Sequence, residues 1–212
     1  MTAYLSTADD LALHAPRILG YASAKRIAAH FHLDADEVED RLLEYAAKGW
    51  VTHSRFADNS GWHLTDAGRS EDERRLSVEL DFAGARDAVA LAHQAFLPLN
   101  RRFGQTCTNW QIRPTARDPM AFNDHTEWGW DERVFRSLDA IDRQLATVTD
   151  PLASALKRFE GYATRYSSAL AKVNAGQPRW IDAPELDSCH TVWIQLHEDL
   201  LSTLGIPRGM DS

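Results

Sequence analysis

"AKRIAAHFHLDADEVEDRLLEYAAKGWV", residues 24–51, contains two consecutive helix patterns separated by a short break. The first pattern follows Ser23, a residue type that caps helix N-termini, and repeats apolar residues at helical spacing. The second begins after the break HLDAD and ends near Gly49, a residue type that favours helix C-termini. The apolar side of this second helix consists of Val38, Leu42, Tyr45 and Ala46. The stretch therefore predicts a helix–turn–helix.

The residues on either side predict one more helix and a hairpin. Residues 7–22, TADDLALHAPRILGYA, have acidic residues in the first turn, where they complement the helix dipole. Residues 50–65, WVTHSRFADNSGWHLT, combine a β-favouring run, the turn sequence DNSG and a short return strand. The expected order is a helix, the helix–turn–helix and then a hairpin.

Residues 23–69 resemble the winged helix–turn–helix of bacterial transcription regulators, most nearly the MarR-like kind. Besides the two helix patterns, the likeness rests on GWHLTDAGR, which matches the phrase that ends the wing and opens the next helix. The matching residues are Gly61, Leu64, Thr65 and Gly68. Residues 76–212 carry no such likeness.

In regulators of this kind the second helix lies in the major groove, and the wing contacts the backbone or the minor groove. The resemblance therefore implies double-stranded operator DNA as the partner. The helix residues that it assigns to base or phosphate contacts are Lys25, Arg26, Ala35, Asp36, Glu39, Asp40 and Arg41. The residues that it assigns on the wing are His53, Arg55, Asn59 and His63.

The charge of this region opposes DNA binding. Residues 33–50 hold six acidic residues but only Arg41 and Lys48 as bases, and residues 1–75 hold nine Lys and Arg against thirteen Asp and Glu. A carboxylate accepts a hydrogen bond from cytosine N4, but it repels phosphates. The alternative hypothesis is a module that does not bind DNA, in which the acids stabilise the helix N-terminus and contact a basic protein surface. Both hypotheses remain open.

The remaining sequence predicts helices only. Apolar residues recur at helical spacing in residues 76–103, 131–148, 150–173 and 187–205. Asp150 and Pro151 form the cap and first turn expected at the start of the third of these helices. Four amphipathic helices favour a helical bundle.

The predicted fold is mainly α and has two domains. Residues 1–75 form a winged helix–turn–helix with a two-stranded wing, and residues 76–212 form an all-α domain that senses an effector or mediates dimerisation. Regulators of this class bind pseudo-palindromic sites as dimers, so the amphipathic helix at 76–103 is the expected contact of a homodimer.

Aromatic and histidine residues of the second domain are candidates for the site of a small-molecule effector. Aromatic side chains with a few polar groups are typical of such pockets, and these residues would close the end of a bundle cavity. The candidates are Trp110, Arg113, His125, Trp128, Trp130, His190, Trp193 and His197. For the loop FNDHTEWGWDE, residues 122–132, a solvated acidic loop anchored by its tryptophans is the simpler interpretation.

Metal and enzyme chemistry have little support. His190 and His197 are seven residues apart, about 10 Å along a helix, which is too far to share one metal ion without ligands between them. The sequence contains no phosphate loop, Rossmann fingerprint, nucleophile elbow or paired zinc spacing. We therefore expect no enzyme, no metal and no cofactor. A metal-dependent enzyme using His125, Glu127, His190 or His197 is the third hypothesis.

The composition is that of a globular protein in a reducing compartment. Cys107 and Cys189 lie far apart and form no CxxC pair, so free thiols are expected. No apolar run approaches the roughly 20 residues that cross a bilayer, and the first residues carry an acidic pair where a signal peptide carries positive charge. We expect a cytoplasmic protein without membrane contact. The net charge of −8 disfavours nonspecific attraction to nucleic acid.

Overall fold

The computed structural model describes residues 2–56 and 59–210, with the side chains of Phe56 and Asn59 outside the description. The described part is mainly helical and has one two-stranded antiparallel sheet, which confirms the mainly α class. No helix within these residues is long and apolar enough to cross a membrane.

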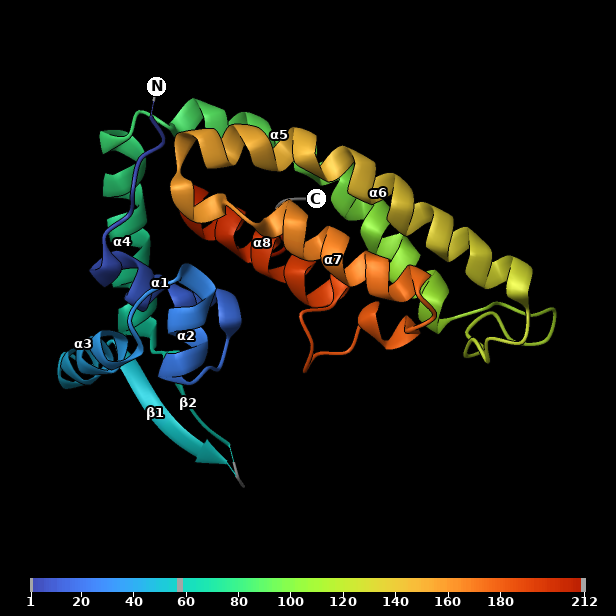
Figure 1. Ribbon diagram of the computed structural model, residues 1–212, viewed down its shortest axis with the longest axis horizontal. Helices are drawn as coiled ribbons and strands as arrows, with labels where there is room; N and C mark the ends of the chain where they lie inside the picture. The colour runs from blue at the N-terminus through green and yellow to red at the C-terminus, as the bar shows by residue number, and fades with distance from the viewer. Residues whose placement is uncertain (1, 57–58, 211–212) are drawn as a thin grey trace. The chain divides into compact units, whose positions relative to one another are not determined.

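The helices and strands follow one another as labelled in Figure 1. The first six are α1 (Ala8–Leu19), α2 (Ala24–Phe31), α3 (Ala35–Ala47), β1 (Val51–Phe56), β2 (Asn59–Leu64) and α4 (Asp66–Phe82). The next six, of which η1 and η2 are single 3₁₀ turns, are α5 (Arg86–Gln111), α6 (Trp128–Ala155), η1 (Lys157–Phe159), α7 (Tyr162–Asn174), η2 (Pro178–Trp180) and α8 (Cys189–Leu204).

The chain forms two compact units. Unit 1 consists of Met1–Val89, Ala153–Arg158 and Gln195–Asp211. Unit 2 contains Ala90–Leu152 and Phe159–Ile194. The domain boundary predicted at residue 75 remains a prediction.

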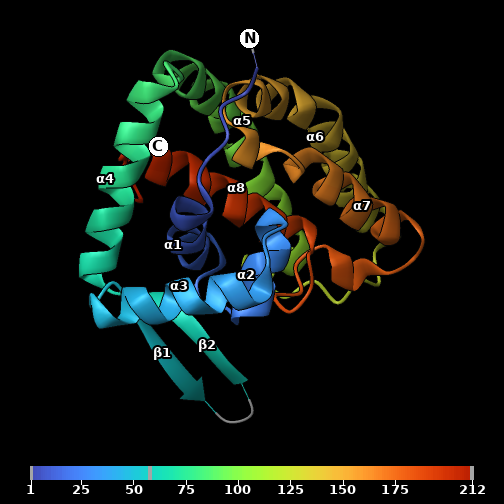
Figure 2. The ribbon, with the colours of Figure 1, turned by 60° about the vertical axis from the view of Figure 1, so that its left-hand side comes forward.

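The first three helices and the hairpin share a hydrophobic core in unit 1. Leu13 of α1, Ile27 of α2 and Leu42 of α3 are fully buried there. Trp62 of β2 joins this core and exchanges two backbone hydrogen bonds, of 3.2 and 2.8 Å, with Ala22, which ties the hairpin to the segment before α2. In Figure 2, α3 lies across the base of the hairpin, and the hairpin projects beyond it.

Local signals place α2 and α3 as the sequence predicts. The Ser23 hydroxyl accepts a hydrogen bond of 3.4 Å from the Arg26 N–H and so caps α2. The Asp34 carboxylate accepts the N–H groups of the first turn of α3 at 3.0 Å. Gly49, with φ 73°, follows α3 in the left-handed conformation that glycine adopts without strain.

The GWHLTDAGR motif joins the hairpin to α4. The strands pair in antiparallel register with Val51 opposite Leu64, which confirms the predicted hairpin. The turn predicted at DNSG is wrong, because Asn59, Ser60 and Gly61 belong to β2 and pair with β1. The Thr65 hydroxyl accepts the Gly68 N–H at 3.0 Å and caps α4. A Cβ atom on Gly68 would lie 1.8 Å from the Trp50 carbonyl oxygen, so this crossing of two backbone segments requires glycine. The motif therefore marks a tight backbone contact.

The single helix predicted at 76–103 is wrong. Two helices occupy this stretch, since α4 ends at Phe82 and α5 begins at Arg86. Gly84 between them has φ 60°, a conformation typical of helix C-termini. The break changes the helical phase, so Leu91, one of the apolar residues of this stretch, is 66% exposed.

The helix start predicted at Asp150 and Pro151 is also wrong. α6 continues through Pro151 as far as Ala155. A proline inside a helix removes one backbone hydrogen bond. Val148 and Leu152, on either side of it, are at most 1% exposed, and burial of this stripe outweighs the lost bond.

The helices of unit 2 bury the apolar stripes predicted for a bundle. α5 and α6 lie side by side in Figures 1 and 2. The buried stripe residues of α6 are Val134, Leu138, Ile141, Leu145 and Val148, and those of α7 are Tyr162, Tyr166, Leu170 and Val173. Their burial confirms the predicted amphipathic pattern of both helices.

A buried ion-pair network connects α1, α4 and α8 within unit 1. His14 Nδ1 lies 3.1 Å from Asp72 Oδ1, and His14 Nε2 lies 3.2 Å from Asp199 Oδ1. The Arg158 guanidinium bonds both Asp199 and Glu79, the latter at 3.1 Å. All five residues are at most 7% exposed. Nothing in the sequence pattern had singled them out.

Candidate nucleic-acid interface

The outward side of α3 is acidic. Its buried side consists of Val38, Leu42 and Tyr45, which pack on the core of unit 1. The fully described exposed side contains no Lys or Arg, and its larger residues are Asp36, Glu37, Asp40, Leu43 and Glu44. Leu43 is 55% exposed in the middle of these carboxylates.

The four α3 residues predicted to contact bases do not share one environment. Asp36 and Asp40 are exposed and one turn apart, so they point the same way from the helix. Ala35 packs against the hydrophobic core, and Glu39 is half-buried. Only the two aspartates present their carboxylates fully to solvent.

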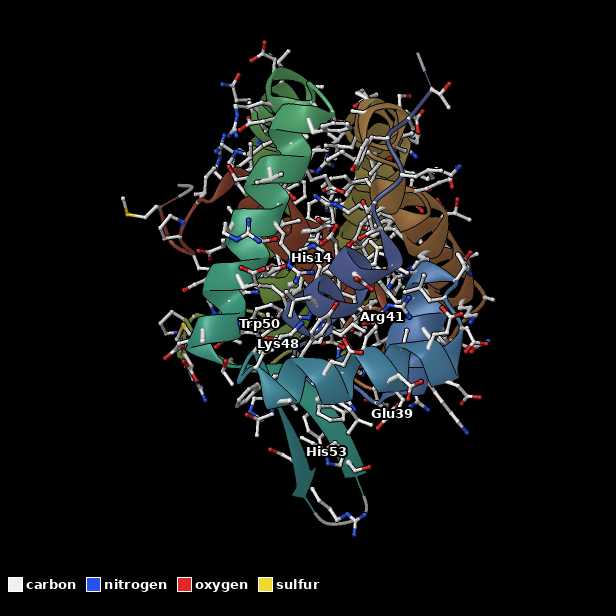
Figure 3. All side chains as sticks on the ribbon, turned by 90° about the vertical axis from the view of Figure 1, so that its left-hand side faces the viewer. His14, Glu39, Arg41, Lys48, Trp50 and His53 are labelled. Carbon is white, nitrogen blue, oxygen red and sulfur yellow. The ribbon has the colours of Figure 1, made fainter. Side chains whose placement is uncertain are left out.

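Arg41, predicted to contact DNA, is held against α1. Its Nε donates to Asp9 Oδ1 at 2.5 Å, and its Nη1 donates to the carbonyl and carboxylate oxygens of Glu37 at 3.0 and 3.3 Å. These hydrogen bonds raise the pKa of Arg41, and the bond to Asp9 has the largest effect. Figure 3 shows Arg41 on the side of α3 that faces α1.

Exposed cations lie on the elements next to α3. Lys25 and Arg26 are exposed in the first turn of α2, and Arg55 is exposed on β1. Figures 2 and 3 place α3 between α2 and the hairpin. The charge therefore changes from positive to negative and back to positive across these three elements.

The wing histidines differ in their contacts. His53 is exposed, and its ring lies over the cross-strand neighbour Trp62, with 4.7 Å between the ring centroids. His63 is half-buried opposite Thr52. The predicted contact residue Asn59 begins β2, and its side chain lies outside the described residues.

A cation and aromatic cluster at the end of α3 escaped the sequence analysis. The Lys48 ammonium lies 4.9 Å from the Trp50 ring centroid and 5.7 Å from that of Tyr45. The Arg75 guanidinium of α4 lies 5.1 Å and 5.7 Å from the same two rings. Such contacts stabilise by roughly 0.5–1 kcal/mol at exposed sites. The cluster connects the C-terminus of α3 and the first residues of the hairpin to α4.

Five of the predicted ligand residues lie between the end of α5 and the first turn of α6 in unit 2, and two of them, Trp110 and His125, meet. Trp110, at the end of α5, stacks on His125 with 4.0 Å between the ring centroids. His125 Nδ1 lies 3.1 Å from Asp131 Oδ2. Asn123, which is buried, donates to Asp131 at 2.7 Å and to the Trp110 carbonyl oxygen at 3.1 Å. The buried carboxylate and amide thus fix the orientation of an exposed imidazole.

The loop predicted at residues 122–132 is a loop only as far as Glu127, because α6 begins at Trp128. Trp130 Nε1 donates to the Asn109 carbonyl oxygen at 2.6 Å, and Arg113 donates to Asp124 at 3.3 Å. Trp128 is 67% exposed, which fits neither a closed pocket nor an anchored loop.

The other three predicted ligand residues lie elsewhere. Trp193 stacks on Phe103 at 4.5 Å and on Phe96 at 4.9 Å in unit 2, and its Nε1 donates to Asn100 at 2.8 Å. His190 faces the same Phe103, which precedes Trp110 by two turns of α5. His197 belongs to unit 1.

The described residues contain no group of three His, Cys, Asp or Glu side chains arranged to hold a metal ion. Cys107 and Cys189 are free thiols, and burial raises the pKa of each to about 12. Comparisons with protein-family models, with curated proteins and with solved structures found no match to this chain.

Proposed function

We propose that this chain is a DNA-binding transcriptional regulator whose first part is a MarR-like winged helix–turn–helix. The observation that carries the proposal is the charge order across the exposed elements: Lys25 and Arg26 on α2, Asp36 and Asp40 on α3, and Arg55 on the hairpin. α3 occupies the major groove, and the two flanking elements contact the sugar–phosphate backbones.

This charge order suits a helix inserted between two phosphate backbones. Base edges lie at the centre of the groove, where the exposed carboxylates of Asp36 and Asp40 accept hydrogen bonds from cytosine N4. The phosphates border the groove, where Lys25, Arg26 and Arg55 meet them. The acidic side chains at the centre of the groove weaken binding to every DNA sequence that has no hydrogen-bond donor opposite them. The domain therefore gains sequence selectivity and loses nonspecific affinity.

The regulator acts as a cytoplasmic homodimer on a pseudo-palindromic operator. Two α3 helices then contact half-sites about 34 Å apart, one turn of DNA. An effector that binds one arrangement of the dimer better than another shifts this spacing and with it the affinity for DNA. The stretch predicted as one helix at 76–103 is divided between α4 and α5. The longer of the two, α5, is the proposed subunit contact.

Selection of duplexes from a random-sequence library, followed by fluorescence anisotropy at two salt concentrations, tests this function. We expect an enriched cytosine-containing motif and submicromolar binding that weakens with salt. Arg55→Gln should reduce the magnitude of the salt slope by about one, because one phosphate contact is lost. Arg136→Gln is the matched control, since Arg136 is exposed on α6, far along the chain from the proposed interface. A library with no enriched sequence rejects the proposal.

The second candidate function is a module that binds a basic protein surface. The specific observation in its favour is Leu43, 55% exposed on the same outward side of α3 as Asp36 and Asp40. An apolar residue within an acidic face suits a basic amphipathic helix. A partner that survives nuclease treatment, and that the double variant Asp36→Asn/Asp40→Asn loses while Arg136→Gln retains it, would favour this function over DNA binding.

A further inference from the structure

We propose that a pocket within unit 1, between the N-terminal segment, α1 and α4, binds a free α-amino acid with an apolar side chain. The pocket has a volume of about 370 Å³. This volume lies in the range of small-molecule sites, roughly 300–1,000 Å³. Its lining combines apolar side chains with two guanidinium groups and two carboxylates.

The apolar wall consists of Tyr4, Val78 and Phe82. The Tyr4 and Phe82 rings meet edge to face, with 5.7 Å between their centroids. Backbone hydrogen bonds of 2.9 Å to Ala155 and from Lys157 fix Tyr4 in place. Val78 and Phe82 are nevertheless 57% and 80% exposed. An apolar ligand group on this wall would remove that exposed surface from water.

The guanidinium group of Arg74 retains unused donors. Arg74 donates through Nε and Nη2 to Glu71, at 2.8 and 2.9 Å. Arg75 donates through Nε to Glu71 at 2.7 Å and through Nη1 to Asp10 at 3.1 Å. Each guanidinium has five N–H donors. Arg74 Nη1 therefore remains for a ligand carboxylate, whereas Arg75, which also hydrogen-bonds Tyr45, meets the ligand by exchanging a partner.

The carboxylates of Asp10 and Glu79 retain acceptor capacity. Asp10 accepts from Thr7 at 2.6 Å besides Arg75, and Glu79 accepts from Ser6 and from Arg158. A carboxylate offers about four acceptor positions, so each of the two has room for an ammonium N–H. A smaller cavity of about 10 Å³ adjoins the same carboxylates, enough for about one water molecule.

Balanced charge is what selects a zwitterion. The pocket is lined by two cationic and two anionic side chains. A ligand with a single charge would be attracted by one pair of these side chains and repelled by the other. An α-amino acid places its carboxylate on Arg74 and Arg75, its ammonium on Asp10 and Glu79, and its apolar side chain on the Tyr4 and Phe82 wall.

The pocket shares Arg75 with the cluster at the end of α3. The Arg75 guanidinium lies 5.7 Å from the Tyr45 ring centroid and 5.1 Å from that of Trp50. A ligand carboxylate competes with Glu71 and Asp10 for this guanidinium and moves it relative to both rings. The bound amino acid thereby changes the position of α3 and the hairpin. This link rests on the proposed function, whereas the binding site does not.

Isothermal titration calorimetry on the full chain tests the site. The probes are L-phenylalanine and L-leucine, with 3-phenylpropanoate and 2-phenylethylamine as analogues that lack the ammonium and the carboxylate, respectively. We expect an amino acid to bind and each analogue to bind at least tenfold more weakly. Equal binding of 3-phenylpropanoate, or binding of none of the probes, overturns the proposal.

Two arginine variants locate the site. Arg74→Gln should weaken amino-acid binding at least tenfold, whereas Arg136→Gln should leave it unchanged. The two residues are matched, because their side chains are 62% and 66% exposed and each pairs with a Glu about one turn earlier. Both variants should keep the melting temperature of the parent protein. Undiminished binding by Arg74→Gln would place the ligand elsewhere and reject this pocket.

Fluorescence anisotropy with the selected duplex, with and without the amino acid, tests the link between the pocket and DNA binding separately from the binding site itself. A changed DNA affinity supports the link. Calorimetric binding with unchanged DNA affinity rejects the link and leaves the site standing. A chain that binds the amino acid but no DNA rejects the proposed function alone.

Discussion

Replacement of His14 by glutamine should remove a pH-dependent part of the stability. His14 is 1% exposed and lies between the carboxylates of Asp72 and Asp199. Burial by itself lowers the pKa of His14, but the charges and hydrogen bonds of the two carboxylates outweigh it and raise that pKa from 6.5 to about 9. The network then holds His14 and Arg158 as cations against three carboxylates.

The size of the effect follows from the difference between the two pKa values. A rise of about 2.5 pH units, at about 1.36 kcal/mol per unit, corresponds to about 3 kcal/mol of unfolding free energy. Because the folded pKa lies above the unfolded one, this stabilisation is complete below pH 6.5 and is lost as the pH rises through 9. Between these values the folded state binds one more proton, so stability falls by about 1.4 kcal/mol per pH unit.

Guanidinium unfolding of the parent protein and His14→Gln, at several pH values from 6 to 9.5, measures the effect. The free-energy difference between the two proteins should shrink by about 3 kcal/mol across this range. Groups that do not contact His14 titrate alike in both proteins and cancel in the difference.

His190→Gln is the control, because His190 lies against Phe103 and has no carboxylate partner among the described residues. Its unfolding free energy, measured at the same pH values, is the reference for the effect of replacing a histidine that no carboxylate contacts. If the difference for His14→Gln is as large at pH 9.5 as at pH 6, His14 is neutral in the folded protein and the charge assignment is refuted.

Three further perturbations test local packing and burial. Gly68→Ala should destabilise by about 3 kcal/mol, the upper range for overpacking, because its Cβ would meet the Trp50 carbonyl oxygen at 1.8 Å. Gly104→Ala, in a helix and with open space around its Cβ, should stabilise by about 0.5–1 kcal/mol in the same denaturant assay. Since burial raises the pKa of the Cys107 and Cys189 thiols to about 12, an aromatic disulfide reagent at pH 8 should modify them quickly only after unfolding. Rapid modification of the folded protein would contradict that burial.

Elements set by local signals were predictable from the sequence. Ser23 and Asp34 cap helices through hydrogen bonds that reach two or three residues along the chain, and Gly49 follows α3 with a positive φ. Such signals depend on neighbours only. The break at Gly84 is equally local, but a continuous apolar spacing across residues 76–103 concealed it.

Sites that depend on long-range contacts were predictable only as sets of residue types. Trp110 and His125 do meet, because the loop after α5 returns to the end of that helix. Trp193 does not join them, since an aromatic residue in a helix packs wherever its face is buried, here against Phe103. Composition suggested one aromatic pocket, and packing distributed its members among different contacts.

The acidic residues of α4 leave a signal of the buried ion-pair network in the sequence. They also show why that signal alone does not reveal the network. Asp72 and Glu79 occupy the same helical stripe as Leu76 and Leu80, at positions i, i+4, i+7 and i+8. Charged residues are almost never fully buried unless they are paired, so an acid on an apolar stripe implies a cation from another element. The sequence near α4 does not tell which cation this is or where it lies, because His14 and Arg158 are 58 and 79 residues away from their partners on α4. Removing one member leaves the others charged and buried, so an arrangement of α1, α4 and α8 that left one of them unpaired would be strongly disfavoured.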